Sequence, residues 1–177
     1  IGLNFLTVEF DIAVRPGQTI TAKGYDDVEF LISTNPGESL KPLSQVASGG
    51  ELSRIMLAIK TVLAGRDEID TLIFDEIDTG ISGRTAWKVA EQLSVLSGAH
   101  QVICITHLPQ IAAMADVHFV IEKSSTDDMT ITDIHKVSAE ESLAELARLL
   151  GSDALTEAAL SNAKEMKEQA GMFKETR

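Results

Sequence analysis

An apolar run that ends in two adjacent acids is the first feature of this sequence that could do chemistry. Residues 71–74 read Thr-Leu-Ile-Phe, and Asp75 and Glu76 follow directly. A short apolar run flanked by charge is typical of a buried parallel strand, and ligands bind at the carboxyl ends of such strands. Asp75 is therefore a candidate Mg²⁺ ligand, and Glu76 could orient or deprotonate an attacking water. The structural alternative is a strand that simply ends in solvated acids.

A glycine pair at the mouth of a predicted helix could bind phosphate. Ser48, Gly49, Gly50 and Glu51 immediately precede residues 52–63, whose apolar positions follow a helical spacing. A helix N-terminus offers unpaired N–H groups and a positive dipole, which Glu51 would also favour. Glycines let a phosphate approach the backbone closely, and the Ser48 hydroxyl can donate a hydrogen bond. The alternative is an ordinary capped helix after a flexible loop.

Two more segments follow buried strands in the same way. The predicted strand 101–106 leads into His107, which could hydrogen-bond a terminal phosphate or an attacking water. A lone histidine at a strand end is more often structural. Residues 78–83, which begin with Asp78 and contain two glycines, are predicted to form a tight, accessible loop directly after the acidic pair. Taken alone, this loop is only a turn.

The remaining pattern predicts the elements that position these residues. Alternation over residues 6–14 predicts a half-buried strand that a turn at Pro16-Gly17 ends, and residues 28–33 predict a second, antiparallel strand. Further strands are predicted at 117–122 and 129–137, with a turn at 124–128 between them, and further helices at 86–96, 108–115, 139–150 and 154–170. Alternating strands and helices indicate an α/β fold: a mainly parallel sheet flanked by helices, with a small antiparallel side sheet. Nothing marks an internal boundary, so residues 1–177 are predicted to be a single domain.

The composition favours a soluble globular protein. Hydrophobic residues make up 44% and charged residues 24% of the chain, which excludes a disordered chain. No apolar run reaches the roughly 18 residues of a membrane span. The single cysteine, Cys104, lies in an apolar run and is predicted to be a core hydrophobe rather than a catalytic thiol. The chain starts without Met or a basic leader, so we expect it to be part of a longer polypeptide.

The formal net charge of −12 argues against a DNA-gripping role for this chain by itself. An acidic surface repels phosphate backbones at long range. If the intact protein binds DNA, we expect a local basic patch or another part of the molecule to do so.

Taken together and in this order, the four segments resemble the signature motif, Walker B motif, D-loop and switch histidine of ABC-type ATPase heads. Within that superfamily the chain is most similar to the SMC/RecN class. The resemblance extends over about residues 28–123, and its most specific stretches are 46–54, 74–83 and 106–112. ABC transporter subunits usually carry Gln where Glu51 stands.

The resemblance implies the C-terminal half of an ATPase head that uses ATP and Mg²⁺. Asp75 would hold the metal, and Glu76 and His107 would complete the site formed with the N-terminal half. That half would carry the Walker A loop, G-x-x-x-x-G-K-[ST], which is absent from this sequence. Without it, the chain alone is expected to show little or no ATPase activity.

The resemblance also implies a homodimer of heads with ATP between them. Ser48 and Gly50, with Gly49 and Glu51 of the same motif, would contact the terminal phosphate on the opposite head, and Asp78 would lie near the dimer interface. The implied setting is cytoplasmic and nucleoid-associated, in repair of DNA double-strand breaks, with DNA bound by the intact protein and no membrane partner.

Three other functions fit parts of the pattern. One is an ABC transporter ATPase subunit, which would have a membrane partner. Another is a non-catalytic dimerisation module of the same fold, although such a module need not keep Asp75, Glu76 and His107. The last is an independent DNA-binding module, which the net charge disfavours.

Overall fold

The computed structural model describes residues 2–5, 7–45, 48–63, 68–125, 130–151 and 155–176. Along the chain the elements are β1 (Glu9–Thr21), β2 (Gly24–Ser33), β3 (Lys41–Pro42), the 3₁₀-helix η1 (Leu43–Gln45), α1 (Gly49–Leu63), β4 (Thr71–Phe74), α2 (Gly83–Leu96), β5 (Gln101–Cys104), α3 (Pro109–Ala113), β6 (Phe119–Ser125), β7 (Thr130–Lys136), α4 (Ala139–Leu149) and α5 (Glu157–Glu175). Several predicted positions lie outside the described residues: Leu6, Val46, Ala47, residues 126–129 and Ala154.

Strand β1 is longer than its sequence predicts. It pairs antiparallel with β2, as expected, but it does not end at Pro16-Gly17. The register shifts between Pro16 and Thr21 instead, and the chain turns at residues 22–23. A side chain at Gly17 would place its Cβ 2.2 Å from the carbonyl oxygen of Tyr25, so this glycine permits a close approach of two strands. The Pro-Gly pair therefore marks an irregularity inside the hairpin rather than its turn.

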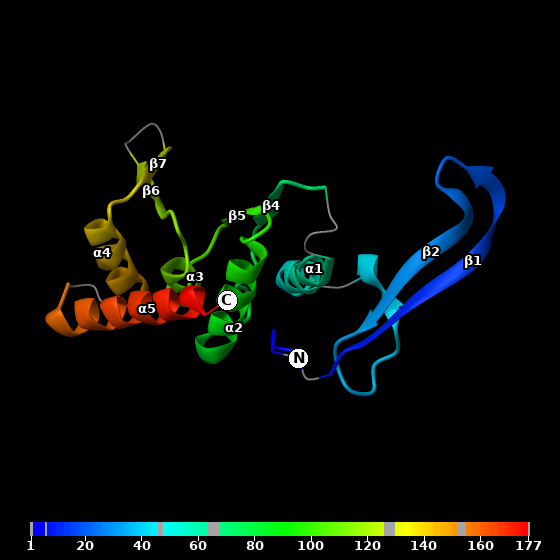
Figure 1. Cartoon of the computed structure of the whole chain (residues 1–177), viewed down its shortest axis with the longest axis horizontal. Helices are drawn as coiled ribbons and strands as arrows, with labels where there is room; N and C mark the ends of the chain where they lie inside the picture. Colours follow the sequence, from blue (N-terminus) through cyan, green and yellow to red (C-terminus); the bar gives the residue numbers. More distant parts are fainter. Residues whose placement is uncertain are drawn as a thin grey trace.

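The apolar face of the β1–β2 hairpin is exposed, contrary to the prediction of a half-buried strand. Phe10 and Phe30 stack with ring centroids 5.8 Å apart, yet they remain 47% and 46% exposed. Figure 1 shows the reason: the hairpin extends to one side, away from the helices. The period of two correctly predicts an apolar face, but nothing in this part of the structure covers it.

Strands β4 and β5 form the parallel pair that the site depends on. They run in register from Thr71 opposite Gln101 to Phe74 opposite Cys104. One face of this pair packs on helices, and the buried cluster there includes Leu57, Leu72, Phe74, Ile77, Val89, Leu93, Leu96 and Ile111. The other face is open, and Ile73 is 68% exposed. The pair is therefore covered on one face only, whereas the sequence predicts burial on both.

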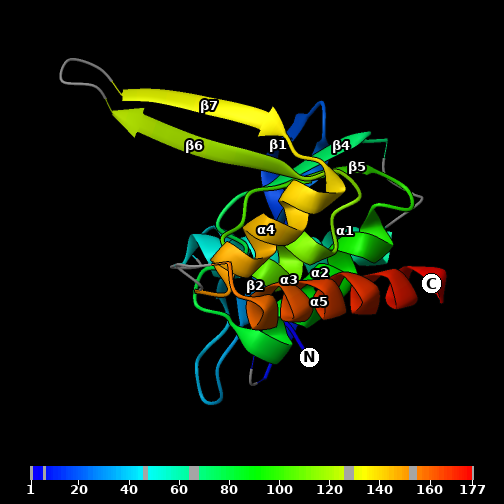
Figure 2. The ribbon, with the colours of Figure 1, turned by 90° about the vertical axis from the view of Figure 1, so that its left-hand side faces the viewer.

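The expectation of a mainly parallel sheet holds for β4 and β5 alone. The predicted strand 117–122 corresponds to β6, which does not join the parallel pair but pairs antiparallel with β7. Only four residues separate these two strands, too few for a parallel crossover. Figure 2 shows that the β6–β7 hairpin projects from the body, and its apolar residues, Phe119 among them, are exposed.

The predicted helices are confirmed with shifted ends. Helices α3, α4 and α5 pack together around a second apolar cluster that includes Ala112, Leu146, Ala163 and Met166. Helix α4 begins with a capping box, in which Glu141 N donates to Ser138 Oγ and Ser138 N donates to Glu141 Oε2. The Ser138 hydrogen bonds lower the pKa of Glu141.

Within the described ranges, no helix has both the length and the apolar character that crossing a membrane requires.

Candidate functional site

The carboxyl ends of β4 and β5 bring two of the predicted segments to one edge of the parallel pair. The pairing continues one residue past the strands, because Ile105 N donates to Phe74 O at 3.0 Å. Beyond this point one chain enters the loop 75–82 and the other reaches Thr106 and His107. The register of the two strands therefore places the acidic pair and the histidine segment side by side, as the sequence predicts.

Asp78 is the residue that joins these two loops. It is only 3% exposed, although the sequence predicts an accessible loop here. Its Oδ2 accepts hydrogen bonds from Thr106 Oγ1 at 2.6 Å and from the backbone N of His107 at 2.9 Å. Thr106 Oγ1 in turn accepts from Leu108 N at 3.0 Å, at the start of α3. A single buried carboxylate thus fixes the turn from β5 into α3, while Thr79 and Gly80 beside it remain exposed.

The same carboxylate also lies beside the ring of His107. His107 Nδ1 lies 3.0 Å from Asp78 Oδ2, and the imidazole is 72% exposed. Because a carboxylate is only an acceptor, its oxygen at this distance favours the tautomer with the proton on Nδ1. In the neutral ring Nε2 is then an acceptor that is free to face solvent. Such a ring can accept a hydrogen bond from water, whereas it would have to be doubly protonated to donate to a phosphate.

The acidic pair turns sharply at the end of β4. Asp75 Oδ1 accepts from Glu76 N at 2.9 Å, and its carboxylate is otherwise exposed. Glu76 has φ +56°, in the left-handed region that non-glycine residues rarely occupy. The described residues contain no cluster of three or more His, Cys, Asp or Glu that could hold a metal. Asp75 therefore does not belong to a preformed cluster of metal ligands in the described part of the chain.

Helix α1 begins directly against this turn. Ser48 O accepts from Leu52 N at 3.0 Å, and Ser48 Oγ makes no hydrogen bond within the described part of the chain. Ser53 Oγ donates to Asp75 O at 3.0 Å. The carboxylate of Glu76 lies beside Gly49, because a Cβ at Gly49 would be 2.6 Å from Glu76 Oε2. The structure therefore joins the glycine segment to the acidic pair of the same chain.

Gly50 is needed for this close approach. A Cβ there would lie 2.8 Å from the backbone oxygen of Glu76 and 3.0 Å from Thr79 Cβ. Gly50→Ala should lower the free energy of unfolding by about 1–3 kcal/mol, because the methyl group forces α1 away from this backbone. Gly49→Ala is the matched control, since its methyl group meets only a movable carboxylate. Urea unfolding measures both variants, and equal losses would contradict this explanation of Gly50.

Arg54 is the residue of this region to which sequence reasoning assigns no role. It is 3% exposed and lies on the buried face of α1. Its guanidinium donates hydrogen bonds to backbone carbonyl oxygens and is turned away from solvent. Burial lowers the pKa of Arg54, and the charge of Glu51, half-buried in the first turn, opposes that shift. The sequence does contain a sign of this burial: a charged residue within an otherwise apolar helical pattern, four positions after Gly50.

Cys104 is half-buried and packs against the core cluster, which is close to the predicted core position. Burial raises the pKa of its thiol to about 12, and the charges of Asp78 and Asp75 act in the same direction. A thiol with such a pKa is almost entirely protonated near neutral pH, so it is a poor nucleophile.

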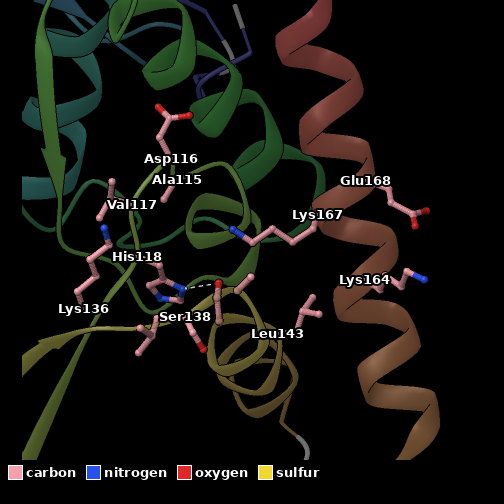
Figure 3. Close-up of a pocket in the computed structure, with 13 residues that line it drawn as sticks. Ala115, Asp116, Val117, His118, Lys136, Ser138, Leu143, Lys164, Lys167 and Glu168 are labelled. Atoms are coloured by element: carbon pink, nitrogen blue, oxygen red, sulfur yellow. Dashed lines mark hydrogen bonds between the residues drawn. The ribbon is translucent and has the colours of Figure 1, made fainter.

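A separate cleft of about 490 Å³ lies between α4, α5 and the base of the β6–β7 hairpin. Figure 3 shows Lys167 reaching into it from α5 toward His118. His118 Nδ1 lies 2.9 Å from Ser142 Oγ. Burial and the charge of Lys174 lower the pKa of Lys167, and burial and the charge of Lys167 lower the pKa of His118. The cleft shares no lining residue with the four predicted segments.

Sequence comparison connects the chain to known proteins. No protein-family model matches it. It is 49% identical to the DNA repair protein RecN of Bacillus subtilis over 157 residues, which are 89% of the chain and 27% of that protein. It is 54% identical to the DNA repair protein RecN of Treponema pallidum over 143 residues, which are 81% of the chain and 25% of that protein. The chain is a homologue of one segment of RecN.

The chain thus spans about a quarter of the length of these RecN relatives. Among solved structures, it is similar to an Smc head domain with a coiled coil and joint from Pyrococcus yayanosii, with a TM-score of 0.56 and 21% identity. That match covers 83% of the chain and 26% of the Smc structure. At this identity it shows the fold, and the chain has a mixed α/β fold of the kind found in Smc heads.

Proposed function

We propose that this chain supplies the C-terminal part of an ATP-binding and ATP-hydrolysing head in a RecN-type DNA repair protein. The observation that carries the proposal is the convergence of two loops at the carboxyl ends of β4 and β5. One loop brings Asp75 and Glu76, and the other brings His107. Their order along the chain matches ABC-type heads, and relatives bearing the RecN name match most of the chain.

Each of the three side chains has a distinct role in this proposal. Asp75, exposed at the strand end, holds Mg²⁺ together with water and phosphate oxygens. Glu76 orients or deprotonates the water that attacks the terminal phosphate. His107 accepts a hydrogen bond from that water through Nε2, because its Nδ1 faces Asp78.

A second segment of the longer polypeptide would complete this site. The outer face of the β4–β5 pair exposes Ile73, Ile103 and Ile105. A contiguous exposed apolar surface commonly marks an interaction site. We propose that the N-terminal half of the head covers this face and contributes the Walker A loop that cradles the ATP phosphates.

A second head would complete the assembly. Ser48, whose hydroxyl has no partner within the described part of the chain, and the adjacent Gly49, Gly50 and Glu51 would face the ATP of that head. Asp78 then lies behind the interface and supports it from within. DNA would be bound by other parts of the intact protein, because the chain carries a net charge of −12. In this proposal residues 1–177 act as one lobe of a cytoplasmic, nucleoid-associated protein.

The test uses a chimera in which this chain replaces the matching segment of Bacillus subtilis RecN. Asp75→Asn should lower Mg²⁺-dependent ATP turnover about 10²-fold and raise the Mg²⁺ concentration that gives half-maximal activity. A coupled phosphate-release assay measures both quantities. The matched control is Asp26→Asn, on exposed strand β2. Unchanged turnover and Mg²⁺ dependence in the Asp75 variant would remove Asp75 from the site.

A further inference from the structure

Arg54 contacts the backbone on both sides of Asp78. Its Nη1 donates to the carbonyl oxygen of Ile77 at 3.1 Å and to that of Thr79 at 2.8 Å. Its Nε donates to Leu3 O at 3.1 Å, and its guanidinium lies 5.8 Å from the centroid of the Phe5 ring. Because these contacts satisfy the buried cation with neutral carbonyls, its position is tied to the backbone of the loop.

On the opposite side of that backbone, Asp78 holds the histidine segment. Its Oδ2 accepts from Thr106 Oγ1 and from His107 N, and it faces His107 Nδ1 at 3.0 Å. The path is therefore continuous: the guanidinium holds the two carbonyls that flank Asp78, and the Asp78 carboxylate holds His107. Both charged groups are almost completely buried, so solvent does little to loosen either contact.

We propose that Arg54 is a positioning residue that keeps the Asp78 carboxylate against His107 and so holds the imidazole with Nε2 facing the nucleotide. This inference rests on the proposed function, because His107 acts in hydrolysis only there. It adds a residue with no nucleotide contact of its own. Arg54 also connects the start of α1 to the His107 segment, since a Cβ at Gly50 would lie 3.1 Å from Arg54 Nη1. A shift at the start of α1 would thus reach His107 of the same chain.

The first measurement reads the histidine directly. In the full chain labelled with ¹⁵N-histidine, long-range ¹H–¹⁵N spectra at pH 8 report which ring nitrogen carries the proton. The wild-type chain should show His107 as the Nδ1–H tautomer, and Arg54→Met should shift it toward a mixture of tautomers. Arg54→Lys should give an intermediate mixture, because an ammonium cannot span two carbonyls as a planar guanidinium does. Arg84→Met, at an exposed position of α2, is the control.

The second measurement follows catalysis in the RecN chimera. Arg54→Met should lower kcat about tenfold while the KM for ATP stays within about threefold, because the variant misplaces a group that acts after ATP binds. Arg54→Lys should recover part of kcat, and it replaces the Met variant if that protein does not fold. A purely structural role would lower the amount of active protein without changing the His107 tautomer.

The outcomes separate the two proposals. An unchanged His107 tautomer in both Arg54 variants, in folded protein, would overturn the positioning role. The same holds if kcat of both variants equals that of the wild-type chimera. A wild-type chimera with no ATPase activity would instead contradict the proposed function, while the tautomer measurement would still decide whether Arg54 controls His107 through Asp78.

Discussion

In the RecN chimera, Glu76→Gln should slow ATP hydrolysis by about 10³-fold while ATP remains bound between the two heads. Glutamine keeps the size and shape of the side chain, so the left-handed turn at Glu76 and the adjacent start of α1 should be preserved. It cannot take a proton from water, and the chemical step therefore loses its base. Single-turnover hydrolysis of radiolabelled ATP measures the loss.

The same variant should accumulate as an ATP-bound dimer, because ATP joins the two heads and hydrolysis no longer separates them. Glu168→Gln, at an exposed position of α5 remote from the strand ends, is the control and should hydrolyse ATP as the wild type does. Single-turnover hydrolysis at the wild-type rate in the Glu76 variant would contradict the role of Glu76 in activating water.

Ser48→Arg should abolish ATP-dependent dimerisation of the heads. Ser48 lies half-buried just before α1, and its hydroxyl makes no hydrogen bond within the described part of the chain. An arginine here adds a long side chain where the phosphate of the opposite head must approach, so the two surfaces clash. Sedimentation analysis with ATP, in the Glu76→Gln background, gives the fraction of dimer.

Ser161→Arg, at an exposed position of α5, controls for the added size and charge. It should dimerise with ATP like the parent protein. If the Ser48 variant also dimerises with ATP, then Ser48 does not face the nucleotide of a second head. The start of α1 would in that case serve the fold alone, through the close approach at Gly50.

Local patterns predicted the elements that carry the site. The helical spacing after Gly50 gave α1, and two short apolar runs gave the parallel pair β4–β5. Because the carboxyl ends of parallel neighbours share an edge, the sequence could also predict that the loops after β4 and β5 lie together. These predictions succeed because each depends on a few consecutive residues.

Pairing and burial were less predictable. The short apolar pattern in residues 117–122 could not distinguish a parallel strand from one arm of an antiparallel hairpin, and the short connection after β6 decides this. The burial of Asp78 depends on Thr106 and His107, 28 and 29 residues further along the chain. A local pattern contains no information on such a partner. The same holds for Arg54, whose carbonyl acceptors lie 23, 25 and 51 residues away.

The exposed apolar faces differ from the prediction for another reason. The periodicity at Phe10 and the apolar run at Ile73 both predict surfaces that should be covered, and both are open. In the proposed function these surfaces meet other parts of the longer polypeptide, since the chain spans about a quarter of its RecN relatives. The sequence therefore predicted the faces correctly but could not supply what packs on them.

In the proposed function, Asp75, Glu76 and His107 form one part of an ATP site that other segments must complete. Its most direct test is steady-state Mg·ATP turnover by the 177-residue chain alone, in parallel with the RecN chimera that contains it. We expect turnover by the chimera and none above background by the isolated chain at equal concentration. Turnover by the isolated, monomeric chain at the rate of the chimera would contradict it.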